Sequence, residues 1–101
     1  MVKSELIRAL SEKLPALQLK DVDLSVNCII QHMEEALSQG KRIEVRGFGN
    51  FTVRHRPPRT ARNPKTSALV ELPAKSSIHF KPGKEMRDLV NAYRGKYRIT
   101  E

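Results

Sequence analysis

One stretch of the sequence decides the fold: Pro57-Pro58-Arg59-Thr60-Ala61-Arg62-Asn63-Pro64-Lys65-Thr66. It holds three prolines, three cations and almost no apolar side chain, so it cannot be packed inside a protein. Apolar and polar residues alternate on both sides of it, at Phe51 and Val53 before it and at Val70 and Leu72 after it. Alternation with a period of two predicts strands. Two strands joined by a bare basic segment predict an arm, over about residues 55–78, that reaches away from the body of the protein.

The sequence before the arm predicts two helices and a hairpin. Apolar residues at helical spacing predict a first helix over residues 3–14, which Pro15 ends. A broad apolar stripe predicts a second helix over residues 19–37, and Gly40 lies where its C-terminal cap belongs. This stripe is wide for so small a protein, so we expect part of it to pack on a second chain. Residues 41–46 and 51–56 alternate as strands around a turn at 47–50, and the outer face of this hairpin carries arginines.

After the arm, the pattern predicts a short strand and a last helix. Ile78 and Phe80 resume the alternation, and the helix opens at Pro82-Gly83-Lys84-Glu85 and ends at Gly95. The residues from 95 to 101 remain as a loose basic tail. The side of this helix that we expect to be buried consists of Met86, Leu89, Val90 and Tyr93.

The composition excludes several classes of protein. The chain has 101 residues and a net charge of +8, which suit one domain that binds a polyanion, most commonly a nucleic acid. Its single cysteine, Cys28, excludes an intrachain disulfide framework and fits a reducing compartment, and we expect the thiol to be buried. No apolar stretch has the length of a membrane span or a signal peptide, so we expect a soluble intracellular protein with no membrane partner.

The positive charge is concentrated in the middle of the chain. Residues 1–40 have a net charge of −2, residues 41–66 a net charge of +7 and residues 67–101 a net charge of +3. Glu44 is the only acid between residues 41 and 66. A solvated face normally mixes both signs, so this segment is interpreted as the working surface and the first forty residues as scaffold.

Three motifs carry a resemblance to a known family. They are Arg46-Gly47-Phe48-Gly49-Asn50-Phe51, Arg62-Asn63-Pro64-Lys65-Thr66 and His79-Phe80-Lys81-Pro82-Gly83-Lys84, in this order and with this spacing. Through them, residues 1–94 resemble the HU and integration host factor family without gaps. The segment 42–46 and Tyr93 resemble most closely the beta chains of integration host factor.

The resemblance implies a fold and a function. The fold is α+β, with a helical hairpin, a three-stranded antiparallel sheet with a protruding β-ribbon arm and a C-terminal helix, in an intertwined dimer. Residues 1–94 would be one domain and residues 95–101 a tail. Members of the family are architectural proteins of the bacterial cytoplasm and nucleoid, which bind double-stranded DNA through its minor groove and bend it sharply. Such bending supports recombination, replication and transcription regulation, and it needs no cofactor.

The resemblance assigns roles to the residues of the arm. Pro64 lies where the family's proline wedges between two base pairs, and proline suits this task because it is compact, apolar and stiff and has no N–H to leave unsatisfied. Beside the wedge, Arg59, Arg62 and Asn63 can bond to the acceptors on the floor of the groove. The arm residues expected to neutralise phosphates are Arg54, Arg56 and Lys65.

The foot of the arm and the flanks complete the expected DNA site. By resemblance, Arg46 reaches the bases, and Glu44 orients it, because a carboxylate that faces DNA is unfavourable unless it is paired. The alternative is that Glu44 forms a plain cross-strand charge pair with Arg42 or Arg46 and does not orient a DNA-binding side chain. The expected flanking track consists of Lys75, Lys81, Lys84 and Arg87, with backbone N–H groups at Gly83 and Lys84 and with Lys3 at the first helix. Each lysine alone is equally typical of a solvated surface charge.

The chain departs from the family's pattern at a few positions. The family usually has glycine where this chain has Ala61 and Ser67. If the backbone needs a positive φ at either position, a side chain there strains the arm. Val2 replaces the polar residue that commonly caps the first helix, which predicts a weaker start of that helix.

Several other functions are alternatives. Within the same class, the chain could be an HU-like homodimer with little site preference, or it could pair with an alpha-like chain. In another class, it could be a basic RNA- or ribosome-binding protein, although the arm has no aromatic residue on which to stack bases. An enzyme is not expected, because His55 and His79 have no evident acid or nucleophile beside them. Cys28 and His32 are only two potential ligands, so no metal site is expected.

Overall fold

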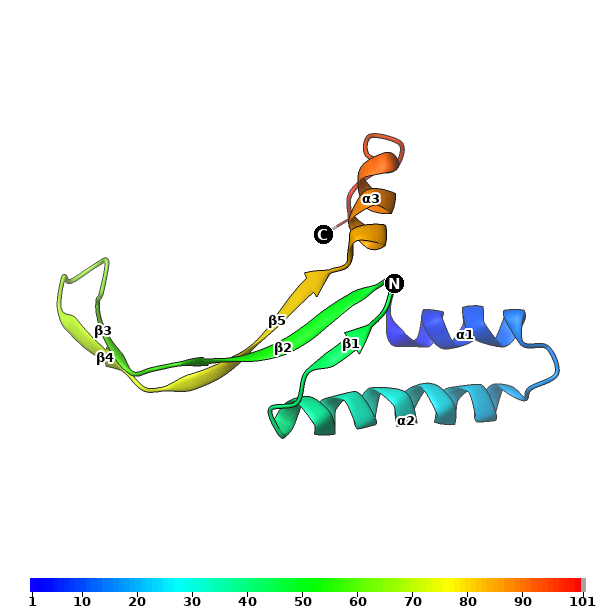
Figure 1. Cartoon of the computed structure of the whole chain (residues 1–101), viewed down its shortest axis with the longest axis horizontal. Helices are drawn as coiled ribbons and strands as arrows, with labels where there is room; N and C mark the ends of the chain where they lie inside the picture. The colour runs from blue at the N-terminus through cyan, green and yellow to red at the C-terminus, as the bar shows by residue number, and fades with distance from the viewer. Residues whose placement is uncertain (101) are drawn as a thin grey trace.

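Eight elements follow one another in the computed structural model, which describes residues 1–100 (Figure 1). They are α1 (Lys3–Lys13), α2 (Leu19–Ser38), β1 (Ile43–Val45), β2 (Gly49–Arg56), β3 (Arg59–Arg62), β4 (Leu69–Leu72), β5 (Lys75–Pro82) and α3 (Lys84–Ala92). The expected α+β architecture is confirmed, with a helical hairpin, a three-stranded antiparallel sheet, a protruding arm and a C-terminal helix.

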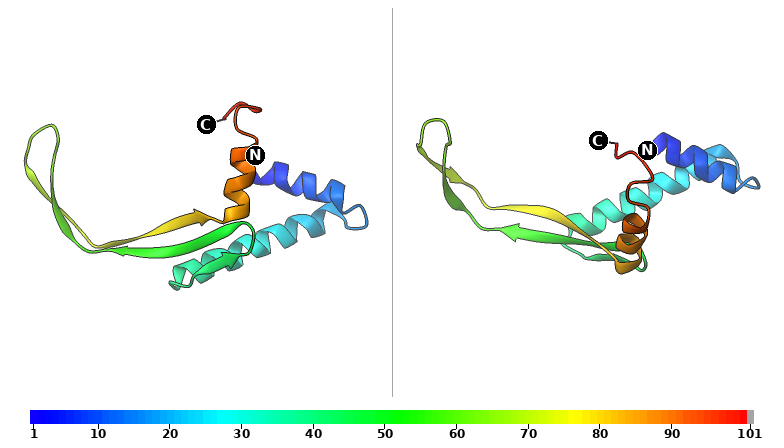
Figure 2. Two further views of the ribbon diagram at one scale, coloured as in Figure 1. Left: turned by 45° about the horizontal axis from the view of Figure 1, so that its top comes forward. Right: turned by 90° about the horizontal axis from the view of Figure 1, so that it is seen from above.

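The small core lies between α1 and α2, which run side by side in opposite directions (Figures 1 and 2). Ile7 of α1 and Val22 and Val26 of α2 are buried, and Leu10 and Ile30 pack against them. Burial of each such side chain contributes roughly 1.5–3 kcal/mol to stability. Within residues 1–100, no helix combines the length and the apolar character that crossing a membrane requires.

The ends of the first two helices follow from local chemistry. Gly40 ends α2 with a φ of +76°, and the N–H of Lys41 donates to the carbonyl of Ala36 at 3.0 Å, which is the bond of a Schellman motif. Gly40 therefore caps α2 as predicted. At the start of α1, the side chain of Val2 makes no capping bond, and the carboxylate of Glu5 accepts the N–H of Val2 at 3.3 Å instead.

The sheet has the order β1-β2-β5, with both pairs antiparallel. Because Val45 pairs with Gly49, the turn between β1 and β2 covers only residues 46–48, and the expectation of a turn over 47–50 was wrong at its far end. The reason is a close approach. A Cβ at Gly49 would lie 2.7 Å from both the carbonyl oxygen of Lys81 and the ring of Phe80, so only glycine lets β5 pass this near and draws position 49 into the ladder.

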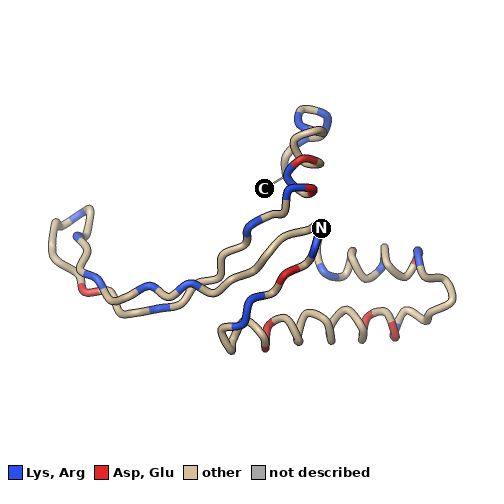
Figure 3. Tube along the Cα trace, viewed as in Figure 1, with Lys and Arg blue, Asp and Glu red and all other residues tan. Residues whose placement is uncertain are grey.

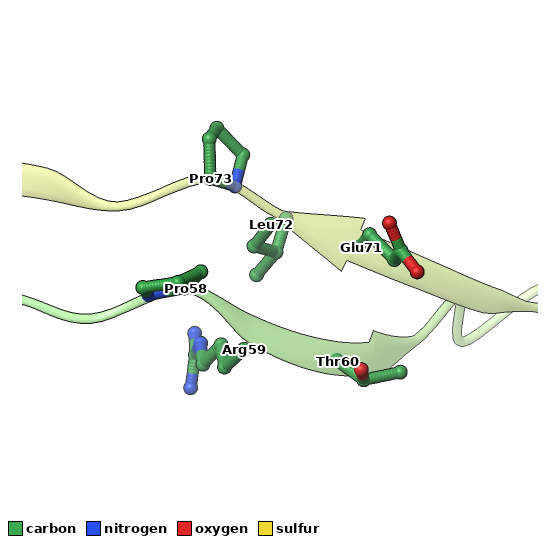
Figure 4. A pocket seen from close by; sticks show the side chains of 6 residues that line it. All are labelled: Pro58, Arg59, Thr60, Glu71, Leu72 and Pro73. Atoms are coloured by element: carbon green, nitrogen blue, oxygen red, sulfur yellow. The ribbon is translucent and has the colours of Figure 1, made fainter.

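The arm is a continuous ribbon with one break in its ladder. The break lies where Pro57 and Pro58 on one side face Pro73 on the other, because proline has no N–H to donate and a fixed φ (Figure 4). Beyond it, β3 and β4 pair as a separate two-stranded sheet. Residues 57–66 were expected to be a bare loop, and this was wrong for Arg59–Arg62, because β4 supplies the backbone partners that make those residues a strand. Their side chains are nevertheless exposed or half-buried, as predicted.

The two arm positions where glycine is usual differ in backbone conformation. Ala61 lies within β3, opposite Val70, in ordinary extended backbone. Ser67 has a φ of +59°, and no other non-glycine residue between 1 and 100 has a positive φ. The N–H of Ser67 donates to the carbonyl of Asn63 at 2.8 Å, which closes the turn at the tip. The tip therefore needs a left-handed residue at position 67 and none at position 61.

Much of the apolar surface has no cover from its own chain. The Cα radius of gyration is 19.3 Å, against about 13 Å for a compact domain of this length. Leu89, Val90 and Tyr93 are 56%, 66% and 47% exposed, so the expected buried side of α3 was wrong for the single chain, and only Met86 is half-buried. Cys28 of α2, also expected to be buried, is exposed. Both faces are open to a covering chain, as the wide stripe of α2 predicted.

Candidate nucleic-acid interface

The register of β2 against β5 separates the cations from the apolar side chains. Residues that pair directly across an antiparallel ladder point to the same face, and the next pair points to the other face. One face therefore carries four cations, with polar residues between them: Asn50, Thr52, Arg54, Arg56, Lys75, Ser77, His79 and Lys81. We call this set the cation face.

The opposite face of the same two strands is apolar. It carries Phe51 and Val53 of β2 and their partners Phe80 and Ile78 of β5, and the rings of Phe51 and Phe80 lie 4.7 Å apart. Val53 and Ile78 share a groove with Leu37 of α2. The apolar face is thus the side on which the body of the protein packs, which leaves the cation face free for a polyanion.

Figure 3 shows how charge is distributed over the fold. The acids of the first forty residues lie on α1 and towards the two ends of α2, while cations follow the ribbon and α3. This agrees with the division of the sequence into an acidic-to-neutral scaffold and a basic working surface. In such an arrangement the positive potential adds up along the ribbon, which attracts nucleic acid before any specific contact forms.

At the foot of the arm, β1 adds its own charged residues to the cation face. Glu44 pairs with Asn50 across the ladder, so it points to the same side. Its carboxylate lies 3.7 Å from the guanidinium of Arg42. Within residues 1–100, the ion pair of Glu44 is with Arg42, and Arg46 stays outside it, in the turn that follows β1. Of the two arginines that flank Glu44 in the sequence, Arg42 is therefore the one paired with its carboxylate.

The tip of the arm presents Pro64 on a braced turn. The side-chain oxygen of Asn63 accepts the N–H of Lys65 at 2.9 Å, and the N–H of Asn63 donates to the carbonyl of Ala68 at 2.9 Å. From the end of β3, the guanidinium of Arg62 donates to the carbonyl of Ser67 at 3.1 Å. Pro64 itself is exposed at the outermost turn. The polar residues beside the proline thus hold the turn in shape, and Arg62 keeps further donors for a ligand.

The start of α3 offers fewer N–H groups than expected. The N–H of Gly83 donates to the carbonyl of Phe48 at 2.9 Å, so its expected role as a phosphate donor is wrong. That bond ties the end of β5 to the turn after β1. The first helical bond runs from Arg87 to the carbonyl of Gly83, so the N–H groups of residues 84–86 have no partner within the helix. Lys84 and Arg87 are both exposed here.

Lys3 lies at the start of the helical hairpin. Its ammonium donates to the side-chain oxygen of Asn27 on α2 at 2.7 Å, and the amide of Asn27 donates in turn to the carboxylate of Asp23 at 2.6 Å. Lys3 is therefore fixed to the helical hairpin, apart from the arm. The strand pairing brings together the predicted residues of the foot and of β2 and β5, and it includes neither Lys3 nor the cations of α3.

Polar residues of the cation face were missed by the sequence reasoning. Thr52, Ser77 and His79 lie between the cations on the same side of the sheet. The signal that identifies them is the strand register, because alternation along one strand does not say which residues of the other strand share its face. Elsewhere, Cys28 and His32 line a groove on α2 together with Leu24, Ile29 and Met33. Because this lining is mostly apolar, it is typical of a surface that packs against other apolar side chains.

Comparisons with known proteins place the chain in a family of DNA-binding proteins. Residues 1–91 match the family described as bacterial DNA-binding protein. Integration host factor subunit beta of Hahella chejuensis is 58% identical over 92 residues, which cover 91% of this chain and 94% of that protein. The corresponding subunit of Methylococcus capsulatus is 53% identical, with 91% and 97% covered.

Solved structures give the same result. An HU–DNA cocrystal structure from Anabaena superposes with a TM-score of 0.77 at 37% identity, covering 89% of this chain and 97% of that one. A mutant HU from Thermotoga maritima superposes with a TM-score of 0.64 at 31% identity, covering 89% and 99%. Both matches include the arm as well as the body, because so little of either chain is left out.

Proposed function

This chain belongs to the family of bacterial DNA-binding proteins, and from that premise we propose that it is a beta-type subunit of an integration-host-factor-like dimer. It is an architectural protein that binds and bends DNA, and its work is binding without chemistry on a substrate. We place it in the bacterial cytoplasm, on the nucleoid, where a sharp bend serves recombination, replication or transcription control. The observation that carries the proposal is the cation face, which continues from the foot of the arm towards its tip.

DNA lies on the cation face in this proposal. Arg54, Arg56, Lys75 and Lys81 neutralise phosphates, and each contact releases counterions, so affinity falls steeply with salt. Beyond the proline break, β3 adds Arg59 and Arg62, which lie three residues apart and therefore point to opposite faces of the ribbon, where each can reach the DNA from its own side. Lys65 meets phosphates beside the tip. At the foot, Arg46 reads base edges. Glu44, held by its ion pair with Arg42, disfavours sequences that place no hydrogen-bond donor near its carboxylate.

Pro64 is the wedge that turns binding into bending. The braced turn presents a stiff apolar ring with no N–H, which can replace one stacking contact without an unsatisfied donor. Unstacking one step costs on the order of a few kcal/mol, which the phosphate contacts of the bent duplex offset. In a dimer, two such arms act together on one duplex.

The dimer follows from the uncovered apolar faces. Ile29 of α2 is 60% exposed and Ile78 of β5 is 62% exposed in the single chain. A second chain that covers them, together with the apolar side of α3, supplies the core that one chain lacks. The partner is either an alpha-like chain or a second copy, and the second copy would make an HU-like homodimer with little site preference.

The test is energy transfer between the ends of a labelled duplex of about 35 base pairs, roughly three helical turns. We expect transfer to rise when the chain is added, alone or with an alpha-like subunit, and to rise much less with Pro64→Ala. Pro15→Ala, in the exposed loop between α1 and α2, is the matched control and should bend DNA like the native chain. Equal transfer for Pro64→Ala and Pro15→Ala would refute the wedge. Preference for RNA over bent duplex in a competition assay would instead favour the RNA-binding alternative.

A further inference from the structure

The residues that follow α3 form an ordered turn against the end of the helix. Tyr93 ends the helix, and the N–H of Arg94 donates to the carbonyl of Asn91 at 3.2 Å. Gly95 then takes a φ of +79°, and the N–H of Lys96 donates to the carbonyl of Tyr93 at 3.1 Å. The left-handed glycine reverses the chain at the end of α3 farthest from the sheet (Figures 1 and 2). The tail expected to be loose therefore begins as a defined turn.

Side chains hold this turn against the helix. The rings of Tyr93 and Tyr97 lie 6.1 Å apart and tilted by 42°, within the range of attractive aromatic pairs. The ammonium of Lys96 lies 4.9 Å from the centre of the Tyr93 ring, in a cation–π contact. The guanidinium of Arg94 donates to both the carbonyl and the side-chain oxygen of Asn91 at 3.1 Å. These contacts fix where the cations of the segment lie.

The segment continues a stripe of cations that begins on α3. Residues 84, 87 and 91 are spaced by three or four, so they share one side of α3. Lys84 and Arg87 are the cations on this side, and Arg94 follows them two residues past Ala92, the last residue of the helix. Past Gly95 follow Lys96 and Arg98, both exposed, and no acid occurs from residue 94 to residue 100.

We propose that Arg94, Lys96 and Arg98 form an additional phosphate-binding site for the DNA that flanks the bend. The inference rests on the proposed function and adds to it a segment beyond residue 91, where the match to the family ends. Figure 3 shows Lys and Arg positions along α3 and in the turn at its far end. DNA that has followed Lys84 and Arg87 along the flank meets the basic turn next.

The test is the salt dependence of DNA affinity for the triple variant Arg94→Gln, Lys96→Gln, Arg98→Gln in the purified dimer. Tyr93, Gly95 and Tyr97 are kept, so the turn retains its backbone and its aromatic pair. Removing each phosphate contact should lower the slope of log affinity against log salt by about 0.9. On a duplex of about 35 base pairs we expect a smaller slope and at least a tenfold loss at about 0.1 M salt. On a duplex of about 15 base pairs, too short to reach the flank, native and variant should bind alike.

The matched control removes three cations from the helical hairpin: Arg8→Gln, Lys13→Gln, Lys20→Gln. These side chains are exposed and the change in net charge is the same, so the long-duplex slope should stay close to that of the native chain. Equal slopes for the tail variant and the native chain would overturn the inference while leaving the proposed function intact. Equal losses on both duplexes with a lower melting temperature would also overturn it, because the segment would then stabilise the dimer. Failure of the native chain to bind either duplex would refute the proposed function itself.

Discussion

Restoring the family's usual glycine at two positions of the arm should have opposite effects. Ser67 holds a φ of +59°, which costs an L-residue with a side chain about 1 kcal/mol, so Ser67→Gly relieves strain at the tip. Ala61 lies in extended backbone opposite Val70, where glycine weakens a strand by about 0.5–1 kcal/mol because it loses more freedom on ordering. Similarity to the family alone would predict that both substitutions improve the arm.

Amide hydrogen exchange at Asn63 measures both effects with one probe. Its N–H donates to the carbonyl of Ala68 at 2.9 Å, directly beyond the last pair of β3 and β4, so it is exposed when the tip opens. The exchange rate changes tenfold for each change of about 1.4 kcal/mol in the free energy of local opening. Ser67→Gly should therefore slow exchange at Asn63 by about three- to fivefold, and Ala61→Gly should speed it by about two- to fivefold.

The amide of Val26, buried in the core between α1 and α2, is the internal control. The arm makes no part of that core, so exchange there should be unchanged in both variants. The reasoning from φ is refuted if the two glycines shift exchange at Asn63 in the same direction. It is refuted equally if Ser67→Gly speeds exchange, because the left-handed residue would then not be the strained one.

Two further substitutions test the packing. Gly49→Ala should destabilise the protein by about 1–3 kcal/mol in chemical denaturation, because its Cβ would lie 2.7 Å from the carbonyl of Lys81. Gly83→Ala, whose added Cβ would lie 3.6 Å from the backbone of Phe48, is the matched control, and equal midpoints would contradict the prediction. Val90→Ser should weaken the dimer by about 2 kcal/mol per chain, because α3 is covered only by a second chain. Calorimetry should show a melting temperature that rises with protein concentration and falls in the variant, and a temperature independent of concentration would exclude an obligate dimer.

The elements with strong periodicity could be predicted from the sequence. The 3.6-residue spacing in α1 and α2 and the capping position of Gly40 depend on the local chain alone, so they needed no knowledge of the fold. The arm could be predicted because a segment with three prolines and almost no apolar side chain cannot be buried. What could not be predicted was β3, since Arg59–Arg62 has no apolar alternation and becomes a strand only because β4 lies opposite.

The details of the site escaped prediction for a similar reason. Whether Gly83 keeps its N–H for a ligand depends on the turn at Phe48, which lies far from it in the sequence. The pairing of Glu44 with Arg42 in place of Arg46 depends on where β1 ends, and that was set by the close approach at Gly49. The apolar side of α3 was identified correctly as a stripe, but its burial depends on a second chain that the single sequence does not contain.

The strand register joins the two functions of the sheet. The alternation that turns Phe51 and Phe80 towards the body also places Arg54 and Lys81 on the cation face, because neighbouring residues of a strand point to opposite faces. A slip of one residue between β2 and β5 would turn over the side chains of one strand relative to the other, so that one ring would join the cation face and the cations of that strand would face the body. Gly49 opposes such a slip, since no other residue fits between the ring of Phe80 and the backbone of β5. Gly49, which carries no side chain, therefore helps to decide which face of the sheet carries the cations.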